Sequence, residues 1–226
     1  MAFNITVFGT CRVESLSNYN LRIRDEISYT YDTKEILEVI RFIKHGHVPP
    51  EDTITTFRTP MISKIPIYSN QFKDILEDTD LFIIEICGKK TYKYINRYIH
   101  SALPHFSNES ISKQIIIDTQ SNDEIESDIV EIITQLNTTN IIVVGHIVTD
   151  SYSNRYDLLK TLESLCIKYN ISFINPVLEI SKKGYDIKDL VQETDVIYHY
   201  NDNGHSIIHQ IYEKYIDKYR HIQSKA

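Results

Sequence analysis

The 226-residue sequence predicts a three-layer α/β/α fold built on a mainly parallel sheet. Three apolar runs, at residues 3–8, 80–88 and 140–146, each end at or beside a glycine. Runs of this kind are typical of strands that are buried on both faces of a parallel sheet. Stretches with helical apolar spacing separate them, and this alternation indicates helices on both faces of the sheet. We expect one domain over residues 1–226, because the sequence has no repeat, linker or low-complexity tract.

The first half of the chain is expected to open with a strand and then to alternate. Its expected strands span residues 3–8, 27–31, 53–57 and 80–88. One helix starts after Asp32 or Thr33, carries Glu35 at the reciprocal capping position and stops at Gly46. Further helices are expected at residues 68–77 and 91–100, and the second of these is rich in tyrosine.

The second half continues the same alternation. Its expected strands span residues 114–118, 140–146 and 171–175, and its expected helices span residues 123–136, 154–169 and 206–219. Residues 191–200 fit either a strand or an extended loop. The apolar spacing in the helix at 123–136 predicts an inward face of Ile125, Ile129, Val130, Ile132, Ile133 and Leu136.

Composition and charge exclude several classes of protein. The net charge of -7 argues against nucleic acid as a main partner, although it does not exclude a local basic pocket that binds phosphates. No apolar run approaches the roughly 18 residues of a membrane helix, and the start of the chain lacks a signal-peptide pattern, so we expect a cytoplasmic protein with no membrane partner. Cys11, Cys87 and Cys166 are too few and too widely spaced for a disulfide framework or a zinc site, and we expect no metal.

A possible nucleophile stands directly after the first strand. Gly9, Thr10, Cys11 and Arg12 form the corner there, and ligands of open α/β sheets gather beyond the carboxyl ends of such strands. The alternative is that Cys11 is a small buried residue at a strand end.

A thiol needs a neighbouring base to become a nucleophile. The best base in the sequence is His205, with Asp202 three residues earlier to hold its imidazole. The alternative is that Asp202 and His205 belong to an ordinary turn before a helix.

These motifs resemble those of the SGNH (GDSL-like) hydrolase superfamily. Gly9-Thr10-Cys11 resembles its Gly-Asp-Ser block, and Asp202-Asn203-Gly204-His205 resembles its Asp-x-x-His block. The strand at 80–88 is similar in position to the strand that carries its Gly-x-Asn-Asp block. A cysteine in the serine position is similar to the branches with Gly-Asn-Cys or Gly-Ser-Cys corners, which are associated with capsule and surface-polysaccharide acyl transfer.

The resemblance implies a flavodoxin-like, SGNH-type sheet and an acyltransferase. The expected reaction moves an acetyl group from acetyl-CoA, as co-substrate, to an amino or hydroxyl group of a sugar or nucleotide sugar in surface-glycan biosynthesis. His205 would be the general base, oriented by Asp202, and Cys11 either carries the acyl group as a thioester or lines the oxyanion pocket. An esterase or thioesterase is the first alternative. A non-catalytic sugar- or nucleotide-binding module, within a longer multidomain protein, is the second.

The sequence departs from the family at the donor of the oxyanion hole. The Gly-x-Asn-Asp block reads Gly88-Lys89-Lys90-Thr91, without the asparagine. We expect the backbone N–H groups at Cys11 to supply part of the hole, with Lys89 or Lys90 as replacement donor.

Further residues are expected to line the site or to grip phosphates. Cationic side chains in loops after strands suit a pyrophosphate or a coenzyme A tail, whereas the glycine-rich signatures of dinucleotide and P-loop sites are missing from the sequence. Each such cation is otherwise an ordinary solvated charge. The expected binding residues are Gly9, Thr10, Arg12, Arg58, Gly88, Lys89, Lys90, His146 and Arg155.

Overall fold

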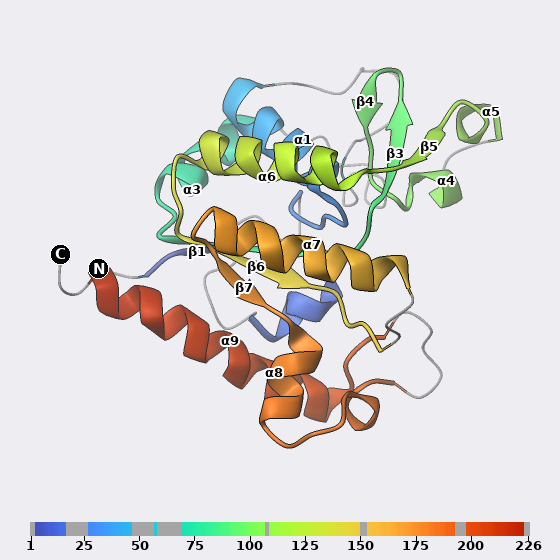
Figure 1. The fold of residues 1–226 in the computed structure, drawn as a ribbon. Helices are drawn as coiled ribbons and strands as arrows, with labels where there is room; N and C mark the ends of the chain where they lie inside the picture. Colours follow the sequence, from blue (N-terminus) through green and yellow to red (C-terminus); the bar gives the residue numbers. More distant parts are fainter. Residues whose placement is uncertain are drawn as a thin grey trace.

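The central element is a parallel sheet of four strands (Figure 1). The computed structural model describes residues 3–16, 27–46, 57, 69–106, 109–149, 153–192 and 198–223. The strands are β1 (Ile5–Phe8), β2 (Leu81–Ile86), β6 (Ile141–Gly145) and β7 (Ser172–Ile174), in the order β1-β2-β6-β7. In the register, Val7 lies opposite Ile83, and Ile83 lies opposite Ile142. The predicted parallel sheet of buried apolar runs is confirmed.

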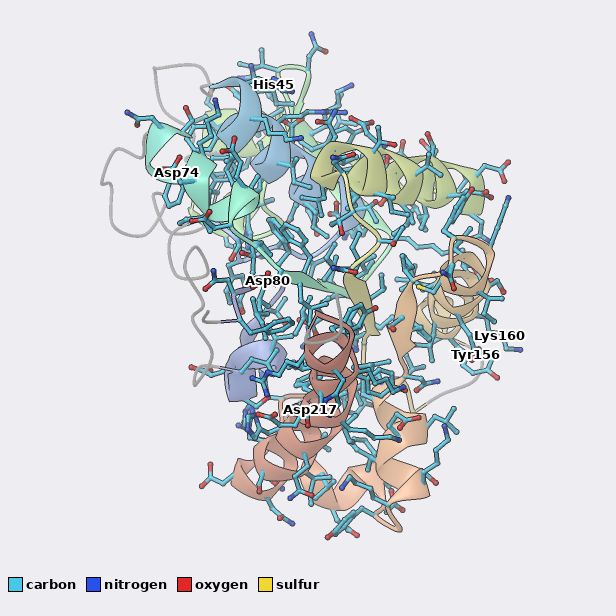
Figure 2. All side chains as sticks on the ribbon, turned by 90° about the vertical axis from the view of Figure 1, so that its left-hand side faces the viewer. His45, Asp74, Asp80, Tyr156, Lys160 and Asp217 are labelled. Atoms are coloured by element: carbon cyan, nitrogen blue, oxygen red, sulfur yellow. The ribbon has the colours of Figure 1, made fainter. Side chains whose placement is uncertain are left out.

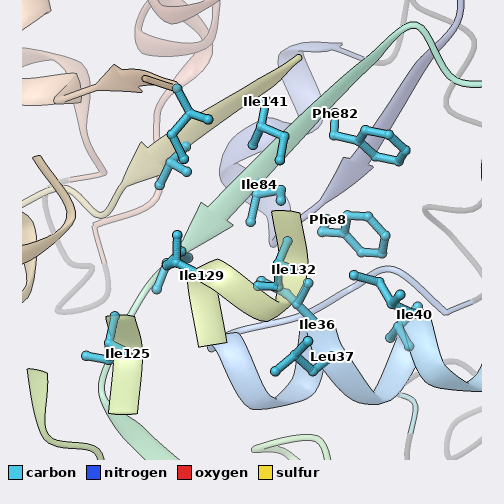
Figure 3. Packing of buried hydrophobic residues seen from close by; sticks show 14 of the residues in the cluster. Phe8, Ile36, Leu37, Ile40, Phe82, Ile84, Ile125, Ile129, Ile132 and Ile141 are labelled. Carbon is cyan, nitrogen blue, oxygen red and sulfur yellow. The ribbon is translucent and has the colours of Figure 1, made fainter. Parts of the chain in front are cut away.

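Helices cover both faces of this sheet (Figure 1), which confirms the three-layer prediction. One face carries α1 (Thr33–His45), α6 (Asn122–Leu136) and α7 (Asn154–Lys168). The other face carries the 3-10 helix η1 (Cys11–Leu16), α8 (Pro176–Lys182) and α9 (Asp202–Gln223). Figure 3 shows the first of these cores, where Phe8, Phe82 and Ile84 of the sheet meet the isoleucines of α1 and α6.

The boundaries of α1 follow its predicted caps. The Asp32 side chain accepts the N–H groups of Lys34 and Glu35, and Gly46 closes the helix at φ 63°. Only the reciprocal cap is wrong. The Glu35 carboxylate accepts instead from the backbone of Tyr31, at 2.7 Å, and of Ser101, at 2.8 Å.

The predicted helix at 91–100 is wrong, because this region forms a hairpin. β3 (Lys90–Tyr94) and β4 (Arg97–Tyr98) pair antiparallel, and β5 (Ile116–Thr119) joins them in a second sheet of order β4-β3-β5. Ile95 and Asn96 make the turn with φ of 42° and 62°. Threonine and tyrosine favour strands, and the prediction of a helix did not take this preference into account. The strand predicted at 114–118 exists as β5, in this second sheet.

Residues 27–31 form an extended segment rather than the predicted strand. Gly9 donates to the Ser28 carbonyl at 3.0 Å, and Thr30 donates back to the Gly9 carbonyl at 3.3 Å. Cys87 donates to the Tyr31 carbonyl at 2.9 Å. The segment therefore crosses from the end of β1 to the end of β2, and its backbone makes no strand ladder. We call residues 27–31 the crossing segment.

The remaining elements are short or shifted relative to the predictions. The helix predicted at 68–77 is split into η2 (Ser69–Gln71) and α3 (Lys73–Glu77). The short helices α4, α5 and η3 span Leu103–Phe106, Glu109–Ser112 and Ile187–Leu190. Val130 is 39% exposed, so its predicted inward position on α6 is wrong.

Two further predicted segments, at 191–200 and 53–57, are only partly described by the structure. Val191 and Tyr200 form an isolated antiparallel bridge within the segment predicted as strand or loop. Of the strand predicted at 53–57, only Phe57 lies in the described residues. None of the helices in the described ranges combines the length and the apolar character needed to cross a membrane.

Candidate functional site

A buried carboxylate fixes the corner that follows β1. Glu85 of β2 is 0% exposed and accepts the Thr10 backbone N–H at 2.8 Å and the Thr10 hydroxyl at 2.6 Å. Its other oxygen accepts Arg12 Nε at 2.6 Å. A side chain at Gly9 would place its Cβ 2.8 Å from the Cβ of Glu85, so the close approach requires glycine there.

The Arg12 and Glu85 side chains form a buried ion pair. Arg12 is 4% exposed and also donates Nη2 to the Cys87 sulfur at 3.0 Å. Burial alone would raise the pKa of Glu85, but Arg12 and the two bonds from Thr10 hold that pKa below its usual value. Burial raises the pKa of the Cys87 thiol. Cys87 therefore stays a neutral partner of the ion pair, because reactivity belongs to the thiolate.

Cys11 is the partly exposed residue between Thr10 and Arg12 at this corner. It opens η1, and its backbone N–H donates to the Tyr29 hydroxyl at 3.3 Å. Tyr29 belongs to the crossing segment, and its ring lies 5.8 Å from the ring of His100. The corner thus places a partly exposed cysteine beside a phenol that the sequence did not indicate.

Asp202 and His205 lie in the first turn of α9, not in a loop before it. The side chain of Asn201 accepts the Gly204 N–H at 2.8 Å, and its carbonyl accepts the His205 N–H at 2.9 Å. Gly204 allows a close backbone approach, because a Cβ there would meet the Leu190 carbonyl oxygen at 2.1 Å. Residues three apart share a helix face, so the exposed Asp202 and the half-buried His205 project from the same side of this turn.

Tyr200 connects this turn to the ion pair. Its ring meets the His205 ring edge-on at 5.6 Å. Burial raises the pKa of the Tyr200 phenol, and the charges of Glu85 and Arg12 both act on it. In addition, α9 packs against η1, the helix that Cys11 opens. Cys11 and His205 therefore sit on two elements in direct contact, with the ion pair beneath one of them and Tyr200 beside the other.

His146 follows β6 as a buried, neutral acceptor. Its Nδ1 lies 2.6 Å from the Ile147 carbonyl, which can only accept, so Nδ1 carries the proton. Burial, with the charges of Arg12 and Arg155, lowers the pKa of His146 to about 3. Nε2 is buried and has no hydrogen-bond partner in the described part of the chain. Because its proton affinity is this low, we do not assign His146 as the general base.

Gly88 and Arg155 are joined through Tyr31. The Tyr31 ring occupies the space above Gly88, where a Cβ would come within 2.7 Å of it. Arg155, half-buried in the first turn of α7, donates to the Tyr31 hydroxyl at 3.4 Å. Arg155 thus lies at the carboxyl end of the sheet, among the groups that follow β2 and β6.

The two lysines after β2 are engaged elsewhere. Lys89 Nζ donates to Asn122 of α6 at 2.6 Å and pairs with Asp157 of α7. Lys90 is exposed in β3, and its ammonium lies 5.5 Å from the centre of the Tyr92 ring. Arg58, the remaining predicted binding residue, lies outside the described residues.

A pair of buried acids anchors the start of α1 next to the crossing segment. Burial raises the pKa of Asp32 to about 7, and the nearby Asp128 carboxylate adds to the shift. Burial and the Asp32 carboxylate hold the pKa of Glu35 well above its usual range. Since Glu35 binds the Tyr31 backbone, this pair also fixes the end of the crossing segment.

One groove among the described residues lies between two of the helices that cover the first face of the sheet. It has a volume of about 270 Å³ and runs between α6 and α7, where Asn122, Glu126, Lys160 and Ser164 contribute to its walls. Figure 2 shows Lys160 beside Tyr156 on the outer side of α7, and the ammonium lies 4.7 Å from the ring centre. None of its lining residues was predicted as a site residue. In the described ranges, no three His, Cys, Asp or Glu side chains are grouped to hold a metal ion.

Sequence reasoning found the corner and missed what surrounds it. It predicted Cys11 and Arg12 as site residues because they follow an apolar strand. It missed the phenols of Tyr29 and Tyr200. The available signal for Tyr29 was the strand predicted at 27–31, which contains this tyrosine.

Comparisons with known proteins add distant likenesses only. No family model matches the chain, and no curated protein matches it. Among solved structures, a lipase/acylhydrolase from Enterococcus faecalis is 12% identical, with a TM-score of 0.45 over 99% of this chain and 96% of that chain. An acetylxylan esterase from Geobacillus stearothermophilus, solved as a catalytic mutant, is 10% identical, with a TM-score of 0.44 over 95% and 94%. Identities and TM-scores this low do not establish a family for this chain.

Proposed function

We propose that this protein catalyses acyl transfer with Cys11 as nucleophile, and that hydrolysis of an ester or thioester is its basic reaction. One observation carries the proposal. The partly exposed Cys11 stands on a corner fixed by a buried ion pair, and its helix packs against the one that begins with Asp202 and His205. Acyl chemistry of this kind uses a nucleophile, a histidine and a carboxylate, and the two packed helices carry all three.

The steps follow the general course of covalent catalysis. His205, oriented by Asp202, takes the Cys11 proton, and the thiolate attacks the acyl carbon of the substrate. The tetrahedral intermediate collapses, the bond to the leaving group breaks, and His205 returns the proton to that group. Water then attacks the thioester, again with His205 as base, and releases the carboxylic acid and the free thiol.

A second candidate is transfer to a sugar instead of water. In that reaction acetyl-CoA donates the acetyl group, and an amino or hydroxyl group of a sugar or nucleotide sugar attacks the same thioester, as in surface-glycan biosynthesis. Arg155 favours it, because a half-buried cation in the first turn of a helix is suited to a phosphate group. The two candidates share every step up to the acyl-enzyme.

Steady-state kinetics on p-nitrophenyl acetate and on acetyl-CoA test the proposal. Cys11→Ala and His205→Ala should each abolish release of nitrophenol or free coenzyme A. The matched control is Cys166→Ala, which removes a buried thiol on α7 and should leave the rates unchanged. Full activity of Cys11→Ala on both substrates would refute a covalent route. Product formation on amino sugars, with coenzyme A release that depends on the sugar, would favour the transferase over the hydrolase. Acceptor binding without turnover of either donor would favour a binding module.

A further inference from the structure

The oxyanion of an acyl-transfer intermediate needs hydrogen-bond donors, but the Thr10 N–H and the expected donors Lys89 and Lys90 are already engaged. The Thr10 N–H is bonded to Glu85 at 2.8 Å. Lys89 is bonded to Asn122 and Asp157, and Lys90 lies over Tyr92 in the second sheet. The asparagine of the Gly-x-Asn-Asp block is missing from this sequence. The Cys11 N–H remains beside the thiol, and one donor alone stabilises an oxyanion poorly.

The Cys11 N–H points at the hydroxyl of Tyr29. Their separation of 3.3 Å is long for such a bond, and the Tyr29 oxygen can only accept from the amide. The phenol oxygen therefore occupies the position in front of this amide that the carbonyl oxygen of a bound substrate needs. The bond from the amide uses a lone pair of the phenol oxygen, so the O–H of Tyr29 keeps the chemical character of a donor.

The crossing segment holds Tyr29 firmly at this place. The residues on either side of it, Ser28 and Thr30, exchange backbone hydrogen bonds with Gly9. Its ring lies against that of His100 at 5.8 Å. A donor held in position by neighbouring groups needs little reorganisation during the reaction, which is what an oxyanion hole requires.

We propose that the Tyr29 hydroxyl is the second donor of the Cys11 oxyanion hole. This inference rests on the proposed function. When an ester or thioester binds, its carbonyl oxygen enters between the Cys11 N–H and Tyr29, and the phenol turns its O–H toward that oxygen. Both donors then stabilise the negative charge that forms when the sulfur attacks. Tyr29 takes the place of the absent asparagine.

Two reactions of the Cys11 thiol distinguish an oxyanion-stabilising role of Tyr29 from a purely structural role. Acylation of Cys11 by p-nitrophenyl acetate forms an oxyanion, whereas alkylation by iodoacetamide displaces iodide and forms none. Tyr29→Phe should slow the acylation burst by about 100- to 1000-fold, as loss of one donor does. The alkylation rate of Tyr29→Phe should stay within about twofold of the wild-type rate, since the thiolate is unchanged. Tyr29→Gln, which keeps a donor, should recover part of the acylation rate.

The matched control is Tyr219→Phe. Tyr219 also uses its hydroxyl inside the fold, bonding the Ile141 carbonyl at 3.2 Å and the Ser172 hydroxyl at 2.9 Å. It lies at the amino end of β6, so both rates should stay at the wild-type level.

Unchanged acylation in Tyr29→Phe would overturn the inference, and so would an equal loss in acylation and alkylation. If Tyr29→Phe does not fold, Tyr29→Met, which also lacks the O–H, replaces it. Acylation slowed far more than alkylation in that variant supports the inference, and equal losses in both reactions overturn it. Failure of the proposed function itself gives a different result, because Cys11→Ala would then keep wild-type ester turnover.

Discussion

Replacing Glu85 by glutamine should destabilise the fold strongly, although the shape of the side chain is almost unchanged. Glu85 is 0% exposed, and its oxygens accept the backbone and hydroxyl of Thr10 and Nε of Arg12. Glu85→Gln leaves the Arg12 guanidinium buried without a counter-charge and turns an amide N–H₂ toward groups that are themselves donors. Removing one partner of a buried ion pair typically costs about 3–5 kcal/mol. We expect a loss of that size in the free energy of unfolding.

Urea denaturation at pH 7, followed by circular dichroism, measures this loss. The matched control is Glu131→Gln, which breaks the pair with Arg41 between side chains that are each 36% exposed. An exposed pair of this kind contributes at most about 1 kcal/mol, so the control should remain close to wild type. A loss below about 1 kcal/mol in Glu85→Gln would refute the view that a charged, buried pair fixes the Cys11 corner.

Three further changes test other parts of the fold. Because the pKa values of Asp32 and Glu35 are raised in the folded state, the folded protein keeps protons that the unfolded chain releases. The free energy of unfolding should therefore fall as the pH rises from about 4 to about 7. The slope should be about 1.4 kcal/mol per pH unit for each retained proton. Asp32→Asn should flatten this part of the curve of unfolding free energy against pH, and an unchanged slope would contradict the assignment. Gly204→Ala should destabilise by about 1–3 kcal/mol in urea, since the new Cβ would meet the Leu190 carbonyl oxygen at 2.1 Å, and a neutral result would mean that the start of α9 is wrongly placed. Ile95→Asn should raise the midpoint of thermal unfolding, because asparagine tolerates a φ of 42° better than a β-branched residue and relieves roughly 1 kcal/mol of strain. A lowered midpoint would argue against the hairpin turn.

Local pattern was sufficient to predict the central sheet and its helices. β1, β2 and β6 are largely apolar runs that end near glycine, and short runs of this kind are typical of buried parallel strands. Asp32 and Gly46 predicted both ends of α1 because capping depends on one residue at each end. These features need no knowledge of distant contacts.

The hairpin could not be predicted in the same way. The turn contains Ile95 in a left-handed conformation that its side chain disfavours, so its first position lacks a residue typical of hairpin turns. Residues 90–94 form a strand because they pair with β5, which lies more than twenty residues further along the chain. A strand whose stability depends on such a partner leaves only a weak local signal.

In the candidate site, too, local patterns predicted some residues, whereas others depend on distant contacts. Cys11 and Arg12 were predicted from their place after a strand, and His205 from its spacing to Asp202. The roles of Tyr29, Tyr31 and Tyr200 depend on where the backbone crosses between strands, which no local pattern specifies. The ionised state of Glu85 depends likewise on Arg12, 73 residues earlier in the chain.

Mass spectrometry of the protein after a brief reaction with p-nitrophenyl acetate tests the central claim most directly. The account predicts one acetyl group on the peptide that contains Cys11, released by neutral hydroxylamine as a thioester is. That adduct should be missing from Cys11→Ala and slow to form in His205→Ala. Acetylation confined to lysines or to other cysteines, with the Cys11 peptide unmodified while nitrophenol is released, would contradict it.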